Sequence, residues 1–175
     1  MKKARYFLLL VFYSFLLLVF NSCSVNKAKI DNSLKKYFDA KNVDGCFTLL
    51  NNADGLITVY NMNLDTTRVL PASTFKIVNS LVGLQTGAIK DESMIIKWDG
   101  IRRPVKEWNK DMNMKEAFKV SCVPYYQEVA RRIGRDTMKL WIDSLAYGNR
   151  NIEGPVDSFW LNNHLKISPD EQLGL

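Results

Sequence analysis

The sequence is poor in the residues that metal sites and many catalytic triads need. It holds one histidine and three cysteines among 175 residues. A zinc site built from several histidines is therefore excluded, and a Ser-His-Asp triad would have to use His164. His164 lies in the polar segment NNHLK at residues 162–166 and is expected to be exposed. We therefore expect no metal.

A strong excess of one charge is also missing. The formal net charge is +6, charged residues make up 24% and hydrophobic residues 47%, which is ordinary for a globular protein. This composition excludes a disordered or collagen-like chain. Basic residues do not cluster with aromatic ones beyond the N-terminus, so a nucleic-acid partner is not expected.

The sequence has no apolar run of the usual membrane-spanning length, but a shorter one lies near its start. Residues 1–5 (MKKAR) are basic, the 15 residues 6–20 are uncharged and largely apolar, and Asn21 and Ser22 follow. A spanning helix needs about 20 apolar residues. The layout is typical of a secretory signal peptide over residues 1–22, with an uncleaved anchor as the alternative.

Cys23 comes directly after this stretch and resembles the cysteine of a bacterial lipoprotein box, whose thiol is lipidated. The match is partial, because Phe20 stands where leucine is usual, and cleavage by an ordinary signal peptidase is the alternative. This predicts a periplasmic protein anchored to the membrane through Cys23, with a tether over residues 23–40. Cys46 and Cys122 are a candidate disulfide in such a compartment, but two separate buried thiols are favoured.

Two short apolar runs predict a β-hairpin. CFTLL at residues 46–50 and LITVY at residues 56–60 are separated by NNADG at residues 51–55. The Asp-Gly pair between β-branched runs is a hairpin signal. Residues 61–70 are expected to be a polar connection.

The rest of the sequence predicts helices. Residues 73–86 are apolar on most sides, which is typical of a buried helix, and Gly87 is suited to cap its end. Further helix signals, in chain order, are Asn113 with Glu116 for a helix running into Ser121, Pro124 for a helix ending near Gly134, Asp136 as a cap, and Ser168 with Pro169 as a start.

The polar residues Ser73 and Lys76 stand out in the first of these helices. Residues three apart share a helix face, so the hydroxyl and the amine are neighbours. A serine becomes a nucleophile when a base takes its proton, and a lysine is a base only when burial favours its neutral amine. Phe75, Ile77 and Val78 provide apolar surroundings. The alternative for this four-residue pattern is a capping serine beside a surface lysine.

Further segments make the sequence resemble the class D serine β-lactamases closely. The matching segments are PASTFK at 71–76, KWDG at 97–100, SCVPYYQEVARRIG at 121–134, YGN at 147–149 and FWL at 159–161. The resemblance starts near Gly45 and continues to the last residue. It implies an α/β fold of the serine β-lactamase and penicillin-binding transpeptidase type over residues 41–175. The sequence would then hold the hairpin and the helical subdomain, without the C-terminal sheet strands and helix.

The resemblance also implies roles for individual residues. Ser73 is similar to the acylated nucleophile, and Lys76 to the lysine that reacts with carbon dioxide to give a carbamate, the general base. Ser121 would relay a proton to the leaving β-lactam nitrogen. Val123 would form a wall of the carbamate pocket, and Trp160 would donate its indole N–H to the carbamate. The implied partners are β-lactam antibiotics, and no cofactor other than the carbamate on Lys76 is implied.

One family motif is missing. Class D enzymes carry K-T-G or K-S-G on a later strand, where it binds the substrate carboxylate and supplies an oxyanion N–H. Neither motif occurs in the sequence, and QTG at residues 85–87 ends a helix instead. We therefore expect a partial domain that is not itself an active enzyme. The hypotheses for the complete protein are a β-lactam hydrolase, a β-lactam sensor that acylates but hardly deacylates, and a penicillin-binding relative; a non-catalytic lipoprotein remnant is the fourth possibility.

Overall fold

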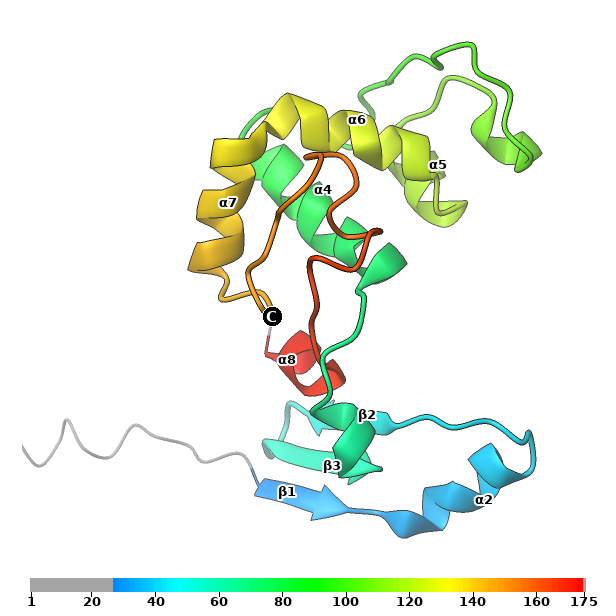
Figure 1. Ribbon diagram of the computed structural model, residues 1–175, viewed down its shortest axis with the longest axis vertical. Helices are drawn as coiled ribbons and strands as arrows, with labels where there is room; N and C mark the ends of the chain where they lie inside the picture. Colours follow the sequence, from blue (N-terminus) through cyan, green and yellow to red (C-terminus); the bar gives the residue numbers. More distant parts are fainter. Residues whose placement is uncertain (1–26, 175) are drawn as a thin grey trace, which may run out of the picture. The chain divides into compact units, whose positions relative to one another are not determined.

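The computed structural model describes residues 27–174, which divide into two compact units at the junction of Tyr60 and Asn61 (Figure 1). The expected signal peptide and Cys23 lie outside the described residues. No helix in the described part of the chain has the length and hydrophobicity that crossing a bilayer requires.

The first unit is a small mixed sheet. Its elements are β1 (Lys27–Ile30), the 3-10 turn η1 (Asn32–Leu34), α2 (Lys35–Asp39), β2 (Phe47–Asn51) and β3 (Leu56–Tyr60). The strand order is β1-β3-β2, with β1 parallel and β2 antiparallel to β3. The β2–β3 pairing confirms the predicted hairpin, and Gly55 takes a positive φ of 69° in its turn.

A tether was expected over residues 23–40, but the structure differs from this expectation wherever it describes that stretch. Residues 27–39 form β1, η1 and α2 instead. A polar stretch such as KAKI can pair because ladder hydrogen bonds use the backbone, and the segment continues with Asp31 N–H donating to the Val59 carbonyl at 2.8 Å. The Phe38 ring also stacks on Tyr60 at 4.8 Å between centroids.

The second unit is helical. Its elements are α3 (Met62–Asp65), η2 (Ala72–Thr74), α4 (Phe75–Gln85), η3 (Lys106–Trp108), α5 (Met114–Lys119), α6 (Val123–Ile133), α7 (Arg135–Ser144) and α8 (Pro169–Leu173). Helices α4 and α6 pack together, and α7 packs on α6 (Figure 1). The capping boxes of Asn113 with Glu116 and of Ser168 with Glu171 are both present, which confirms those two helix starts.

One local expectation was wrong. Asp136 does not cap α7, because the helix starts one residue before it and Gly134 holds the cap position; Asp136 lies in the first turn. The connection at residues 61–70 contains the short helix α3, whose start Asn61 caps from a left-handed conformation. A single turn of helix has too few apolar residues to be visible in a periodic pattern.

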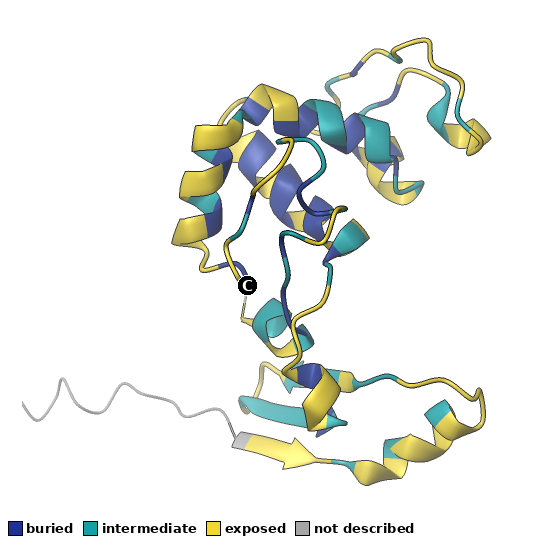
Figure 2. Cartoon of the chain, viewed as in Figure 1, coloured by how far each residue is buried: buried dark blue, intermediate teal, exposed yellow. Residues whose placement is uncertain are grey.

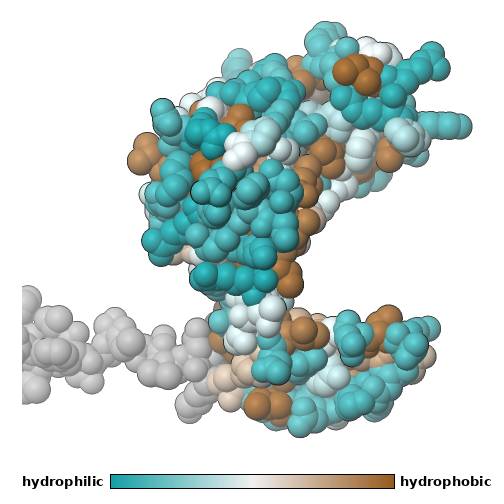
Figure 3. Space-filling view, viewed as in Figure 1, coloured by the Kyte–Doolittle hydropathy of each residue, from teal (hydrophilic) through white to brown (hydrophobic). Residues whose placement is uncertain are grey.

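The core of this unit lies between one face of α4 and the helices and turns around it (Figure 2). Its largest fully buried side chains include those of Phe75, Tyr126, Met138, Tyr147, Phe159 and Trp160. The opposite face of α4 is exposed: Ile77 and Leu81 are 51% and 59% accessible. The expectation that α4 is apolar and buried on most sides therefore holds for one face. The face of the unit seen in Figure 3 is mostly hydrophilic with separate hydrophobic patches.

Candidate active site

Ser73 lies in η2, the tight turn that leads into α4. Thr74 closes this turn, because both its N–H and its hydroxyl donate to the Pro71 carbonyl, at 3.0 and 2.8 Å. Phe75 is fully buried directly after it and fixes the start of α4 in the core. Ser73 itself remains exposed. The sequence thus presents a serine at the surface end of a well-anchored helix.

Lys76 lies three residues after Ser73, and its side chain points towards the Ser73 hydroxyl. Its Nζ is 2.8 Å from the Ser73 hydroxyl oxygen, and the side chain is only 2% exposed. Burial lowers the pKa of the Lys76 amine from its ordinary value of 10.5. No carboxylate lies within salt-bridge distance of it among residues 27–174, while the Tyr126 ring centroid lies 5.9 Å from Nζ. Burial therefore favours the neutral form of an amine that lies within hydrogen-bond distance of the Ser73 hydroxyl.

Ser121 is brought to this pair from a distant part of the chain. Its hydroxyl oxygen lies 2.9 Å from that of Ser73. The residue sits in the turn between α5 and α6 with φ 52°, a left-handed conformation that costs energy for a residue with a Cβ. Hydrogen bonds on both sides hold the turn: Cys122 N–H donates to Ala117 O at 2.8 Å, and the Trp108 indole to Val120 O at 3.0 Å.

The two residues predicted to form the carbamate pocket, Val123 and Trp160, lie in different parts of the helical unit. Val123 is the first residue of α6 and is half-buried. Trp160 is 1% exposed, and its ring stacks on that of Phe75 at 5.2 Å and 28°. Trp160 therefore packs against Phe75, the residue that precedes Lys76 in the chain. Of the predicted site residues, Ser73 is hydrogen-bonded to both Lys76 and Ser121, and Cys23 lies outside the described residues.

The remaining predictions concern single residues. Cys122 is buried with a free thiol, and burial raises its pKa, so it stays protonated beside Ser121. Cys46 is half-buried just before β2. The side chain of His164 is 40% exposed, and its Nδ1 lies 3.7 Å from a carboxylate oxygen of Glu153.

The segment Tyr147-Gly148-Asn149 follows the end of α7. It has a structural role that the sequence did not reveal. The Asn149 side chain behaves like a strand backbone: its Nδ2 donates to His164 O at 2.8 Å, and its Oδ1 accepts from Lys166 N–H at 3.0 Å. Gly148 has φ 50°, and a Cβ there would overlap the Lys166 carbonyl oxygen, so only glycine fits.

A second link missed by sequence reasoning joins α8 to the turn that carries Ser73. Gln172 Nε2 donates to the Tyr147 hydroxyl at 2.8 Å and lies 3.5 Å from the Thr74 hydroxyl, the residue after Ser73. Glu171 accepts from the guanidinium of Arg68, with Nε at 2.9 Å. A glutamine on a short polar helix carries no pattern that would have predicted this contact.

The arrangement suits nucleophilic catalysis without a metal ligand set. A serine hydroxyl, a buried amine and a second hydroxyl lie in one hydrogen-bonded chain, which is the geometry of a nucleophile with its base and a proton relay. Within residues 27–174, no group of three or more His, Cys, Asp or Glu side chains is placed to hold a metal ion.

Known proteins share both the sequence and the fold. Residues 27–175 match the penicillin binding protein transpeptidase domain family. β-Lactamase OXA-5 of Pseudomonas aeruginosa is 42% identical over 174 residues, which is 99% of this chain and 62% of that protein. The class D β-lactamase structure from Sebaldella termitidis gives a TM-score of 0.80 at 37% identity over 85% of this chain and 60% of that one.

A receptor is similar as well. The C-terminal domain of the Bacillus licheniformis BlaR penicillin-receptor gives a TM-score of 0.80 at 34% identity, covering 86% of this chain and 60% of that one. The chain thus spans about 60% of the length of these relatives. It belongs to the penicillin-binding protein transpeptidase domain family, in which its homologues include class D β-lactamases and the BlaR penicillin-receptor.

Proposed function

We propose that this chain carries the acylation centre of a β-lactam hydrolase, with Ser73 as nucleophile and Lys76 as general base. One observation supports this most: the Lys76 amine is buried without a carboxylate partner among the described residues and lies 2.8 Å from the Ser73 hydroxyl. A structural lysine would more often reach solvent or pair with an acid, because burying an unpaired charge is costly.

The proposed steps use the three hydrogen-bonded groups. Lys76 takes the Ser73 proton while Ser73 Oγ bonds to the β-lactam carbonyl carbon. The ring C–N bond breaks as Ser121, 2.9 Å from Ser73 Oγ, gives its proton to the leaving nitrogen and takes the proton held by Lys76, which leaves the amine neutral again. In the second stage Lys76 takes a proton from water, whose oxygen attacks the ester carbonyl. The ester C–O bond then breaks, and Lys76 returns this proton to Ser73 Oγ, so that all three groups regain their starting state.

We further propose that Lys76 carries a carbamate formed from carbon dioxide. The residues fit this modification, because a neutral amine adds carbon dioxide and the apolar side chains of Phe75 and Val78 surround the same helix turn. Such a group supplies a carboxylate-like base at neutral pH. Trp160 and Val123 are the residues proposed to surround it.

A β-lactam receptor is the second candidate, favoured by the similarity to the BlaR penicillin-receptor domain. The two functions share acylation of Ser73 and differ in the fate of the acylated serine. Rapid release of the hydrolysed drug indicates the hydrolase, and a long-lived adduct indicates the receptor.

Acylation is tested by mass spectrometry of the full chain incubated with benzylpenicillin. Ring opening loses no atoms, so the adduct should add the whole mass of the drug, and peptide mapping should place it on Ser73. Ser73→Ala should abolish it, whereas exchange of the exposed Ser93 for alanine should leave it unchanged. An adduct on Ser73→Ala protein, or none on the unmodified chain, would overturn the proposal.

Full turnover is a separate matter, because the sequence contains neither K-T-G nor K-S-G. We propose that residues 1–175 hydrolyse β-lactams far more slowly than a complete class D enzyme. Loss of a single oxyanion donor costs roughly 10²–10³-fold in rate where it has been measured. Nitrocefin turnover at the rate of an intact class D enzyme would contradict this.

Export and anchoring are proposed from the N-terminal sequence. A secretory signal over residues 1–22 and a lipid on Cys23 would place the protein at the periplasmic side of a membrane. Labelling cells with radioactive palmitate tests this, with Cys23→Ala as the control. A soluble, unlabelled periplasmic protein would contradict the lipid anchor.

A further inference from the structure

Ser121 ends helix α5 in a backbone conformation that usually belongs to glycine. Val120 is the C-cap of the helix, and Ser121 follows it with a φ of 52°. Two hydrogen bonds close this end of the helix. Ser121 N–H donates to Phe118 O at 3.1 Å, and the next residue, Cys122, donates its N–H to Ala117 O at 2.8 Å. This pair of bonds is a Schellman motif, whose left-handed position is most often glycine.

A serine at this position carries a steric cost that glycine would not. In a left-handed residue the Cβ lies too close to a carbonyl oxygen of the backbone, so the conformation is unfavourable for a residue with a side chain. Glycine would form the same two bonds without that cost. Serine adds a hydroxyl, and the Ser121 hydroxyl oxygen lies 2.9 Å from that of Ser73. A residue that stabilises the left-handed turn therefore also holds this hydroxyl beside Ser73.

Trp108 stabilises the turn from a segment outside α5. It lies in η3, twelve residues before Val120, and its indole N–H donates to the Val120 carbonyl oxygen at 3.0 Å. This oxygen belongs to the peptide unit that joins Val120 to Ser121, and the N–H of the same unit is the one bonded to Phe118. Both polar groups of the unit are therefore held in place, the N–H by the helix itself and the C=O by Trp108.

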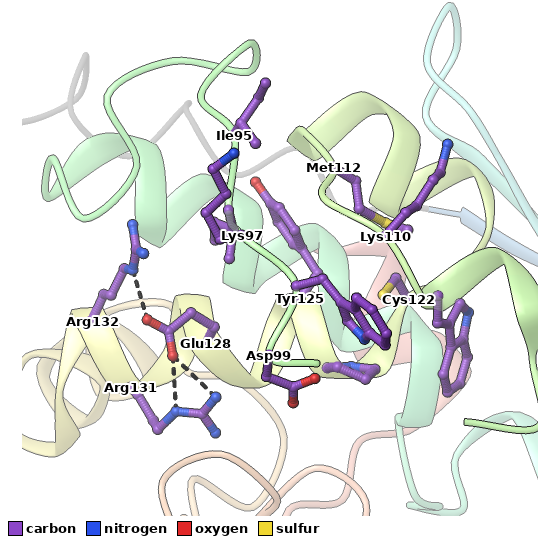
Figure 4. A pocket seen from close by; sticks show the side chains of 14 residues that line it. Ile95, Lys97, Asp99, Lys110, Met112, Cys122, Tyr125, Glu128, Arg131 and Arg132 are labelled. Atoms are coloured by element: carbon purple, nitrogen blue, oxygen red, sulfur yellow. Dashed lines mark hydrogen bonds and ion pairs between the residues drawn. The ribbon is translucent and has the colours of Figure 1, made fainter. Parts of the chain in front are cut away.

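The peptide unit after Ser121 is held as well. Cys122 supplies its N–H, which is bonded to Ala117, and the Cys122 side chain is only 2% exposed. Cys122 and the Trp108 ring both line a small pocket beside α6, in which Figure 4 labels Cys122. With the peptide units on both sides fixed, the direction of the Ser121 Cα–Cβ bond is set, and the hydroxyl can move only by rotation about that bond.

Trp108 is itself firmly placed. Its backbone N–H donates to Val105 O at 3.1 Å, and its side chain packs half-buried against the hydrophobic core of the helical unit. A donor held in this way can orient the carbonyl that it binds.

We propose that Trp108 is a positioning residue for the proton relay. Its indole N–H fixes the peptide unit between Val120 and Ser121, and this keeps the Ser121 hydroxyl within hydrogen-bond distance of Ser73. The inference rests on the proposed function, in which Ser121 gives its proton to the β-lactam nitrogen. Trp108 acts through Ser121 and takes no part in the proton transfer.

The first test is the rate at which benzylpenicillin acylates Ser73 in the full chain, measured by mass spectrometry over a range of drug concentrations. Trp108→Phe removes the donor and keeps an aromatic ring. It should lower the rate at saturating drug roughly tenfold, as expected for one lost hydrogen bond. The half-saturating concentration should stay the same, because the relay acts in the transition state.

Trp98→Phe is the matched control. The Trp98 indole also donates to a backbone carbonyl, that of Ile101 at 3.1 Å, but this carbonyl does not belong to the turn of Ser121. Acylation of the Trp98→Phe protein should therefore be unchanged. Urea unfolding of each variant checks that the fold is kept.

Removing the Ser121 hydroxyl separates positioning from a general structural role. Ser121→Ala protein has no hydroxyl to position, so adding Trp108→Phe to it should lower the acylation rate no further. If Trp108 instead supported Ser73 or the bound drug, the second substitution would lower the rate by the same factor as in the unmodified chain.

The backbone of Ser121 can also be observed without any reaction. Carbon-13-labelled serine gives Cα and Cβ signals whose positions depend on φ, and their loss in Ser121→Ala protein identifies those of Ser121. Trp108→Phe should move these signals away from the positions of a left-handed residue, whereas Trp98→Phe should leave them in place. A chain that is never acylated would thus refute the proposed function, and the role of Trp108 would still be tested.

Three results would overturn the proposal. The first is an unchanged acylation rate in Trp108→Phe protein. The second is a further loss of rate when Trp108→Phe is combined with Ser121→Ala. The third is a set of Ser121 carbon signals that stays the same in Trp108→Phe protein.

Discussion

At the residue scale, the surroundings of Lys76 restrict the charge of its side chain, and those of Gly148 restrict which residue can stand there. Lys76 is buried beside Ser73 and Tyr126, where only a neutral or modified amine avoids the cost of an unpaired charge. Gly148 has a left-handed backbone against the carbonyl of Lys166, where any Cβ would overlap it. Both constraints lead to measurable effects of single substitutions.

The stability of the chain should depend on pH through Lys76. Its pKa is lowered in the folded state from 10.5, so the unfolded chain binds more protons between the two values and stability rises with pH there. In buffer free of carbon dioxide, Lys76→Met should raise the free energy of unfolding at pH 7, and this gain should shrink as the pH approaches 10.5. Lys119→Met, at an exposed position, is the control; a gain independent of pH would contradict the prediction.

The proposed carbamate on Lys76 has its own signature. After addition of ¹³C-bicarbonate at pH 8, the full chain should give one carbamate carbon signal, and Lys76→Ala should remove it. The signal should weaken as the pH falls, because protonation removes the neutral amine that carries the modification. The exposed Lys115→Ala variant should keep the signal. Absence of a carbamate signal from the unmodified chain at any pH would show that Lys76 remains an amine.

Gly148→Ala should be among the most destabilising single substitutions in the helical unit. Left-handed strain adds to a forced backbone shift at Lys166, so a loss of about 3–5 kcal/mol is expected. Gly87 also has a positive φ but open space around it, so Gly87→Ala should cost only about 1–2 kcal/mol. Urea unfolding measures both. Equal losses would mean that the contact with Lys166 relaxes freely.

At the scale of elements, α8 is a short helix that depends on its charges. Ser168 and Glu171 form its capping box, and Arg68 binds Glu171 from the segment that also pairs Val69 with Ile167. Through Gln172 this helix reaches the Tyr147 hydroxyl and lies beside Thr74. The helix that the Arg68–Glu171 ion pair holds in place is therefore the same one that contacts the turn that carries Ser73.

The capping box makes this element sensitive to acid. The bond from Arg68 lowers the pKa of Glu171 to about 2, so the stability it contributes is present above the ordinary value of 4.5 and is lost as the pH falls towards 2. Glu171→Gln should lower the melting temperature at pH 6. The difference in melting temperature between this variant and the unmodified chain should become smaller between pH 4.5 and pH 2. The control is the exposed Asp170→Asn. Thermal unfolding at each pH measures the difference, and one that stays constant would contradict the prediction.

At the scale of the whole molecule, the two units differ in how much they bury. Val59 is the one buried residue of residues 28–60, whereas the helical unit has a continuous core around Phe75, Tyr126 and Trp160. A small sheet with little buried apolar surface is marginally stable. Amides of β1–β3 should therefore exchange with deuterium much faster than those of α4 and α6, as measured by mass spectrometry of peptides. Equal protection in both units would contradict this.

The sequence predicted the parts of this molecule that depend on residues close together in the chain. The Ser73–Lys76 pair follows from helical spacing, the hairpin from its turn, and the helix starts at Asn113 and Ser168 from their capping boxes. Parts that depend on distant pairing were missed, because no local pattern encodes them. The polar strand β1 pairs in parallel with β3, and Asn149 bonds the backbone at residues 164 and 166.

The spacing of the three site residues also sets an order of assembly. Ser73 and Lys76 are three residues apart, so their hydrogen bond can close as soon as the first turn of α4 winds, on the submicrosecond scale of helix formation. Ser121 lies 48 residues from Ser73 and arrives only after α5 and α6 have docked. During synthesis, Ser73 and Lys76, the proposed nucleophile and base, can therefore meet before Ser121, the proposed proton relay, is in place.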